Sequence, residues 1–176
     1  MVIDTSAIVA IALNEPDAPE IEMRIADDPV RLISAATVLE ATMVLETRLG
    51  DAGGREFDLW LLRIGAEVVA VDAEQADAAR RAWRRYGKGR HAAALNYGDC
   101  FAYALAMTRG EPLLFKGEDF AKTDVETALR SRTRRKYCGN WCRVMWKNIP
   151  RCRDLLSRRR GARALWPAAQ TAWPHQ

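Results

Sequence analysis

The sequence has no long apolar run and almost no histidine. None of its hydrophobic stretches approaches the roughly 18–20 residues that a membrane-spanning helix needs. The first residues, Met1 to Asp4, lack the basic segment and extended apolar stretch of a signal peptide, so we expect a cytoplasmic protein with no membrane association. There are 2 histidines and 4 cysteines among 176 residues. In the cytosol, structural disulfides are not expected.

Acidic residues are nearly missing from the C-terminal quarter of the chain. Residues 130–176 contain 13 basic residues and one acid, Asp154, whereas residues 1–129 contain 14 basic and 22 acidic residues. The net charge is therefore −8 for the first segment and +12 for the second. The second segment is also poor in branched aliphatic residues. It can therefore hardly bury enough apolar surface to compensate for the conformational entropy that it would lose on folding. We expect one domain over residues 1–129 and a basic, poorly ordered extension over residues 130–176.

Other interpretations of the extension stay open. It holds three of the four cysteines and four of the six tryptophans, and tryptophan interleaved with arginine could bind RNA through charge and stacking. Cys138, Cys142 and Cys152 with His175 could bind zinc, although their spacing fits no tight ligand pattern. The segment could also be a readthrough or frame-shift product.

Short apolar runs alternate with longer helical stretches in the first 129 residues, a pattern typical of α/β folds. Strands are predicted at 1–3, 31–33, 67–71 and 113–115, and helices at 6–13, 17–27, 35–49, 55–64, 73–86 and 98–108. Strands separated by helices favour right-handed crossovers and a mostly parallel sheet. Ligands of such sheets bind beyond the carboxyl ends of the strands.

Four acidic residues follow predicted strands or lie in the helices after them, so that they could meet beyond the carboxyl ends of the strands. Asp4 directly follows the first strand, and Asp119 follows the last strand by a short loop. Glu40 lies about two turns into the helix after the second strand, and Asp99 is in the first turn of the most apolar helix. Glu40 and Asp99 interrupt apolar stretches, a costly placement for an ionised group without a partner.

Each of these acids taken alone could be a helix cap, a turn residue or a solvated side chain. Together at one sheet edge they would repel, because two like charges 4 Å apart cost about 4 kcal/mol at an effective dielectric near 20. A hard divalent cation removes this repulsion, and all-oxygen ligands select Mg²⁺ or Mn²⁺. Such an ion can activate water and neutralise a phosphoryl group. The hypothesis is metal-dependent phosphodiester cleavage.

Four stretches together resemble the PIN-domain ribonucleases, and most of all the VapC toxins of type II toxin–antitoxin systems. These stretches are Met1–Ala7, Ala36–Ala41, Asn96–Ala106 and Leu113–Phe120. Their order and spacing make the resemblance specific, and it covers about residues 1–129. It implies a three-layer α/β/α fold around a central, mostly parallel sheet.

The resemblance also implies a site and an activity. Asp4, Glu40, Asp99 and Asp119 would bind Mg²⁺ or Mn²⁺, with Ser6 and Thr5 in a supporting shell. The implied reaction is endonucleolytic RNA cleavage that leaves 5′-phosphate and 3′-hydroxyl ends. The implied partners are a VapB-like antitoxin, whose C-terminal segment covers the acidic groove, and a second copy of the toxin. Glu118 stands where many relatives carry Asn.

Basic residues near the expected site are candidates for holding RNA. Lys116 follows the last strand, and Arg84, Arg85, Lys88 and Arg90 cluster at the end of one helix and in its loop. They could contact phosphates, or the helical ones could form an ordinary solvated face. Asp124 is a candidate fifth acid in the outer shell of the site.

A different functional class would be a non-catalytic metal-binding or receiver-like signalling module on a similar sheet. A receiver domain normally has two adjacent acids after its first strand, whereas Thr5 and Ser6 follow Asp4. A haloacid-dehalogenase-type phosphatase needs an Asp where Ser6 stands. A dinucleotide-binding enzyme would need a Gly-rich turn after the first strand, which the sequence lacks. An inactive PIN scaffold that still binds metal also stays open.

Overall fold

The computed structural model describes residues 1–130, and the account below concerns those residues. The predictions for the C-terminal extension, including its cysteines and tryptophans, lie outside the described residues. In residues 1–130, no helix has both the length and the apolar character that crossing a membrane requires.

The centre of the fold is a sheet of four short parallel strands. They are β1 (Val2–Ile3), β2 (Leu32–Ser34), β3 (Glu67–Val69) and β4 (Leu113–Leu114), in the order β3-β2-β1-β4. The chain thus builds outward from β1 to β3 and then crosses to the other side of β1 to add β4. Because the direction of strand addition reverses next to β1, the carboxyl ends of β1 and β4 flank the crevice where such sheets bind ligands.

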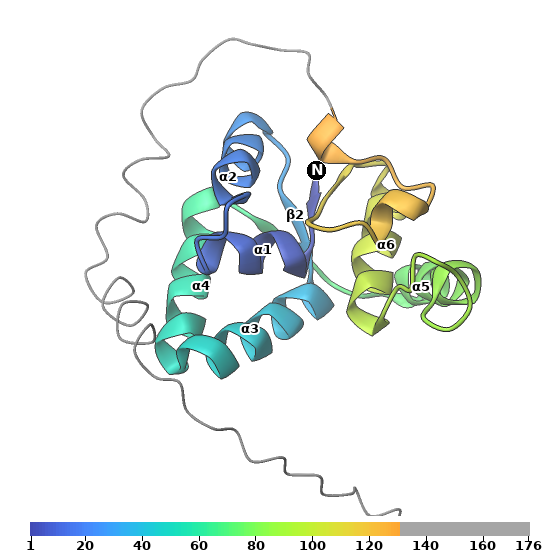
Figure 1. Ribbon diagram of the computed structural model, residues 1–176, viewed down its shortest axis with the longest axis horizontal. Helices are drawn as coiled ribbons and strands as arrows, with labels where there is room; N and C mark the ends of the chain where they lie inside the picture. Colours follow the sequence, from blue (N-terminus) through green and yellow to red (C-terminus); the bar gives the residue numbers. More distant parts are fainter. Residues whose placement is uncertain (131–176) are drawn as a thin grey trace, which may run out of the picture. The chain divides into compact units, whose positions relative to one another are not determined.

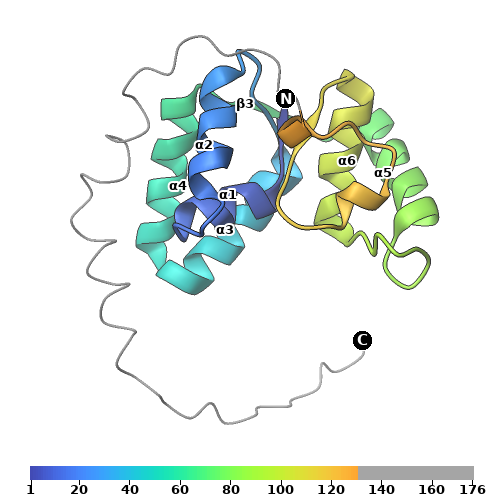
Figure 2. The same ribbon diagram turned by 45° about the horizontal axis from the view of Figure 1, so that its top comes forward.

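Six α-helices cover the sheet in two layers (Figures 1 and 2). They are α1 (Thr5–Ala12), α2 (Ala18–Asp27), α3 (Ala35–Leu49), α4 (Asp51–Ile64), α5 (Ala73–Tyr86) and α6 (Tyr97–Arg109). Helices α1 to α4 lie on one side of the sheet and α5 and α6 on the other. This confirms the predicted three-layer α/β/α fold. Two 3-10 helices follow, at Phe120–Lys122 and Ala128–Arg130.

Helix α6 explains why the second layer packs so closely. Its buried positions include Ala102, Ala104 and Ala106, and α5 presents small residues in return, Ala78 and Ala82. Small side chains let the two helices and the sheet approach closely, and close packing maximises dispersion contacts. The nearly all-round apolar character of α6 therefore follows from its central position.

Two predicted element boundaries were wrong by more than one residue. Helix α4 begins at Asp51, not Arg55, although Gly53 and Gly54 are poor helix formers. A Cβ at Gly53 would lie 2.9 Å from the carbonyl oxygen of Leu45, so the glycines allow α4 to pack tightly on α3. Strand β3 ends at Val69, not Val71.

The segment after β4 is tied to the edge of the sheet. The Leu113 amide donates to the Glu126 carbonyl at 2.7 Å, and Leu113 forms an isolated parallel bridge with Thr127. Phe120 is buried in the core, and Arg24 donates to the carbonyl of Leu129 at 3.2 Å. The domain therefore includes residues up to about 130.

We expect a chain truncated after Arg130 to unfold cooperatively, with a midpoint within about 2 °C of the full-length protein. Truncation after Asp119 should destabilise the domain by about 3 kcal/mol or more, because it removes the buried ring of Phe120 and the contacts at β4. Thermal unfolding followed by circular dichroism compares the three chains. Equal stability of both truncated chains would show that residues 120–130 are not part of the fold.

Candidate active site

Asp4 is the most buried acid of the predicted site, with 2% of its surface exposed. It caps α1, and its Oδ2 accepts hydrogen bonds from the Ser6 amide at 2.9 Å and the Ser6 hydroxyl at 2.6 Å. Its other oxygen, Oδ1, is buried and has no hydrogen-bond partner among the described residues. A buried acceptor without a partner is costly, so Oδ1 is an oxygen that the fold leaves available to a ligand.

Ser6 joins the ends of β1 and β4. Its hydroxyl donates to Asp4 and accepts from the backbone amide of Lys116 at 2.9 Å. The Asp4 amide donates to the carbonyl of Leu114 at 2.9 Å. The predicted supporting role of Ser6 thus has a geometric basis, because one hydroxyl fixes both the carboxylate and the loop beside it.

Glu40 reaches the same region from α3. The Thr5 hydroxyl donates to its Oε2 at 2.6 Å. A Cβ built on Gly98 would lie 2.2 and 2.3 Å from the two Glu40 carboxylate oxygens. The carboxylate therefore lies directly against the backbone of the first turn of α6, and a side chain at position 98 would displace it. Gly98 precedes Asp99 in the sequence, but nothing in the sequence alone pairs it with Glu40.

Asp99 is held by the start of α6. It forms a capping box with Asn96, in which the Asp99 amide donates to Asn96 Oδ1 at 2.9 Å and the Asn96 amide donates to Asp99 Oδ2 at 2.7 Å. This arrangement satisfies two backbone donors of the helix terminus. Asp99 Oδ1 takes no part in the capping box and is the oxygen available to a ligand.

The pKa of Asp99 shows that the four acids share one environment. The pKa of Asp99 is raised from 3.8 to about 6, mainly by burial; the hydrogen bond from the Asn96 amide opposes this rise, and the charges of Asp4, Glu40 and Asp119 add to it. Burial likewise raises the pKa of Asp4, with the charge of Glu40 acting in the same direction and the Ser6 hydrogen bonds against it. Asp119 lies on the exposed side, at the start of the 3-10 helix Phe120–Lys122.

The carboxylates form an open cluster. In residues 1–130, no three acidic, histidine or cysteine side chains converge closely enough to enclose a metal ion as they stand. The donor set nevertheless fits a hard cation, because it consists of oxygen atoms, carries several negative charges and includes the unpaired Oδ1 of Asp4.

The predicted basic contacts differ in their surroundings. Lys116 Nζ pairs with Glu15 and, at 3.2 Å, with Asp17, so this charge fixes the turn between α1 and α2. Arg90 lies 6.0 Å from the centre of the Trp83 ring. Of the predicted set, Arg84 and Lys88 line a cavity between α5 and α6.

Asp124 has contacts other than those predicted. Its two oxygens accept from the Tyr103 hydroxyl at 2.6 Å and from Arg85 at 2.8 Å. Arg85 also lies over the Tyr86 ring, 4.8 Å from its centre. Asp124 and Arg85 thus neutralise each other and join the C-terminal segment to α5, and none of these contacts leads to the acidic cluster.

The family model described as PIN domain matches residues 1–126. The chain belongs to the PIN-domain family. It is 66% identical over 125 residues to a protein of Mycolicibacterium smegmatis named Ribonuclease VapC, a match that covers 71% of this chain and 97% of the relative. Within the PIN-domain family, the chain therefore belongs to the VapC ribonucleases, as the four motifs predicted.

Solved structures of the same fold are similar at much lower identity. The crystal structure of Mycobacterium tuberculosis VapC20, described as a sarcin–ricin loop cleaving toxin, aligns with a TM-score of 0.60 at 17% identity and covers 70% of this chain and 95% of that one. A toxin–antitoxin complex from Klebsiella pneumoniae aligns with a TM-score of 0.55 at 16% identity, covering 70% and 92%. Both confirm the PIN fold of this chain.

The close contact between Glu40 and Gly98 predicts strong coupling between the two positions. Gly98→Ala should fail to give the gain of up to about 1 kcal/mol expected for glycine to alanine in a helix, because the added Cβ displaces the Glu40 carboxylate from its hydrogen bond with Thr5. In a Glu40→Ala background the same change should be neutral or stabilising, since alanine is the better helix former. Urea unfolding of the four proteins gives the coupling free energy. Additive effects would mean that Glu40 does not lie against α6.

The pKa of Asp99 predicts a pH-dependent stability. Between pH 4 and about 6 the unfolded chain releases a proton that folded Asp99 retains, so the contribution of Asp99 to stability in EDTA should fall as the pH rises through this window. Asp99→Asn keeps the capping oxygen but removes the charge, and should raise the midpoint at pH 8 by about 2–5 °C. The gain should vanish near pH 4. Thermal unfolding from pH 4 to 8 tests this, and a gain independent of pH would contradict it.

Proposed function

We propose that this chain is a Mg²⁺- or Mn²⁺-dependent endoribonuclease and the toxin of a type II toxin–antitoxin system. In this proposal it cleaves RNA with a metal-activated water and leaves 5′-phosphate and 3′-hydroxyl ends. The observation that carries the proposal is the unpaired, buried Oδ1 of Asp4 within a group of carboxylates whose charges raise the pKa of Asp99. The VapC name of a relative with 66% identity supports RNA as the substrate.

The metal would be held by Asp4, Glu40, Asp99 and Asp119. When bound, it would supply an activated water and neutralise charge on the phosphoryl group. The chain's own residues do the positioning. Ser6 fixes Asp4, Thr5 fixes Glu40, and the capping box with Asn96 fixes Asp99. Since three of the four carboxylates are oriented before a ligand arrives, little of their side-chain entropy is lost on binding.

The proposed partners are an RNA substrate, a VapB-like antitoxin and a second copy of the chain. A structural neighbour is a toxin–antitoxin complex, which supports an antitoxin partner. Leu39 and Met43, one turn apart on α3, are exposed apolar side chains next to the helix segment that carries Glu40. An exposed apolar face of this kind favours contact with a second copy. A cytoplasmic location is part of the same proposal.

The receiver-like alternative finds no support in the topology. Receiver sheets have the order 2-1-3-4-5, in which β1 lies between β2 and β3, whereas here β2 lies between β1 and β3. The strand-end lysine that this alternative would use, Lys116, is paired with Glu15 and Asp17.

We expect Asp4→Asn and Asp99→Asn each to reduce Mn²⁺-dependent cleavage of RNA at least 100-fold while the circular dichroism spectrum is unchanged. Both changes remove a ligand charge but preserve side-chain shape. Asp58→Asn is the matched control, because Asp58 is an exposed carboxylate on α4, away from the cluster. Calorimetric titration with Mn²⁺ provides a readout independent of cleavage. Full activity or unchanged Mn²⁺ affinity in either site variant would remove the proposed metal site.

A further inference from the structure

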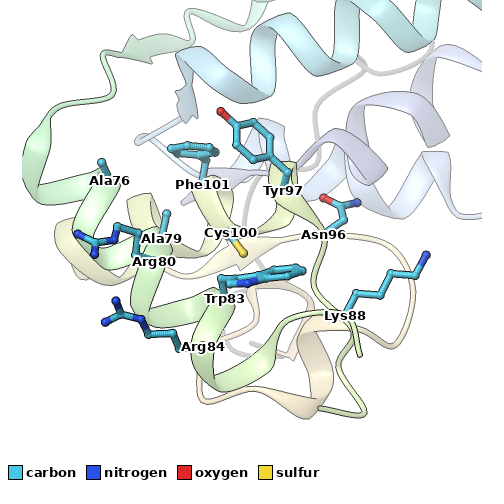
Figure 3. A pocket seen from close by; sticks show the side chains of 10 residues that line it. All are labelled: Ala76, Ala79, Arg80, Trp83, Arg84, Lys88, Asn96, Tyr97, Cys100 and Phe101. Atoms are coloured by element: carbon cyan, nitrogen blue, oxygen red, sulfur yellow. The ribbon is translucent and has the colours of Figure 1, made fainter. Parts of the chain in front are cut away.

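A cavity of about 720 Å³ lies between α5 and the first turn of α6. Figure 3 shows the Trp83 ring on one side of it and the rings of Tyr97 and Phe101 on the other. Arg80, Arg84 and Lys88 also line it, with their charged groups at its rim. The cavity thus combines flat apolar walls with a cationic border.

The aromatic side chains are exposed but held in place. Trp83 exposes 39% of its surface and Tyr97 exposes 77%. A Cβ on Gly87 would lie 2.6 Å from the Trp83 ring, so the absent side chain leaves room for the ring against the backbone. Tyr97 and Phe101 pack edge to face, with ring centres 5.0 Å apart. Exposed rings with fixed orientation are suited to stacking against a flat ligand.

The charges at the rim favour an anion. Arg80 is paired with Asp77 on the same helix at 2.9 Å. Arg84 and Lys88 form no ion pair within the described part of the chain, and no carboxylate from that part lines the cavity. Two uncompensated cations beside exposed rings match a ligand that has both a flat apolar group and negative charge.

The cavity adjoins the acidic cluster. Asn96 lines the cavity, and its backbone amide donates to Asp99 Oδ2 at 2.7 Å. Tyr97 is the next residue of the same turn. A strand of RNA with a phosphate at Asp99 would therefore place a neighbouring nucleotide over the cavity.

We propose that this cavity binds one unpaired nucleobase of the RNA substrate, which stacks on Trp83 while its flanking phosphates contact Arg84 and Lys88. This inference rests on the proposed function and adds how the substrate is selected. A base can enter only when it is unstacked, so the site favours single-stranded RNA or loops. Stacking on aromatic rings tolerates any base and contributes strongly to single-strand binding.

The test measures binding, not cleavage. A fluorescein-labelled single-stranded RNA of 12 nucleotides is titrated with the full-length protein in EDTA, and fluorescence anisotropy gives Kd. We expect Trp83→Leu to weaken binding about tenfold and Trp83→Phe, which keeps a flat ring, to recover most of it. The Trp83→Leu variant should also lose the preference for this RNA over an abasic oligonucleotide of equal length.

Two arginines of α5 provide a matched pair. Arg84→Gln should lower the slope of log Kd against log salt concentration by about 0.7, the value for one phosphate contact in a single strand. Arg81→Gln removes the same charge from the same helix at an exposed position outside the cavity lining. This variant should keep most of the affinity for the RNA and the full preference for the RNA over the abasic oligonucleotide.

Two results would overturn the inference. One is equal binding of the RNA and the abasic chain by the wild type. The other is a Trp83→Leu variant that no longer forms dimers in light scattering but binds RNA with unchanged affinity. That result would mean that the cavity contacts a second copy of the chain. Because these measurements exclude metal, a failure of metal-dependent cleavage is detected separately by the Asp4→Asn comparison.

Discussion

A buried carboxylate at the reversal point of a parallel sheet is the constraint on which the rest of this structure depends. Asp4 ends β1 beside β4, where the strand order turns, and its burial requires donors from the chain itself. Ser6 supplies two of them and also accepts from the loop after β4. The hydrogen bond between the Asp4 carboxylate and the Ser6 hydroxyl thus fixes the chain at the carboxyl ends of β1 and β4.

The other acids near Asp4 are carried by helices: Asp99 and Asp119 lie at helix N-termini, and Glu40 lies within α3. Asp99 lies in the first turn of α6 and forms a capping box with Asn96, the N-cap residue of that helix, and Glu40 comes from α3 against the bare backbone of Gly98. Burial, and to a lesser extent the neighbouring charges, raise the pKa values of Asp4 and Asp99, so the ionised carboxylates at this site oppose folding. Destabilising local arrangements that persist in a well-packed fold are characteristic of functional sites.

Periodicity made the fold predictable, because it locates the strands, and parallel topology then leads to the hypothesis of an acidic site, because it brings the carboxyl ends of the strands together. Contacts between distant segments were not predictable in the same way. The fit of Glu40 over Gly98 and the pairing of Lys116 with Glu15 depend on how α3 and the α1–α2 turn pack. The start of α4 was missed because packing against α3 overrides the low helix propensity of Gly53.

The sheet has one covered and one open border. On the β4 side, the bridge between Leu113 and Thr127 occupies the outer edge. On the other side, β3 is three residues long, and both Glu67 and Val68 are exposed. A short strand with a charged residue is a poor template for a strand from another molecule. The open edge of the sheet therefore resists pairing with a strand of another molecule, which is the contact from which fibrils grow.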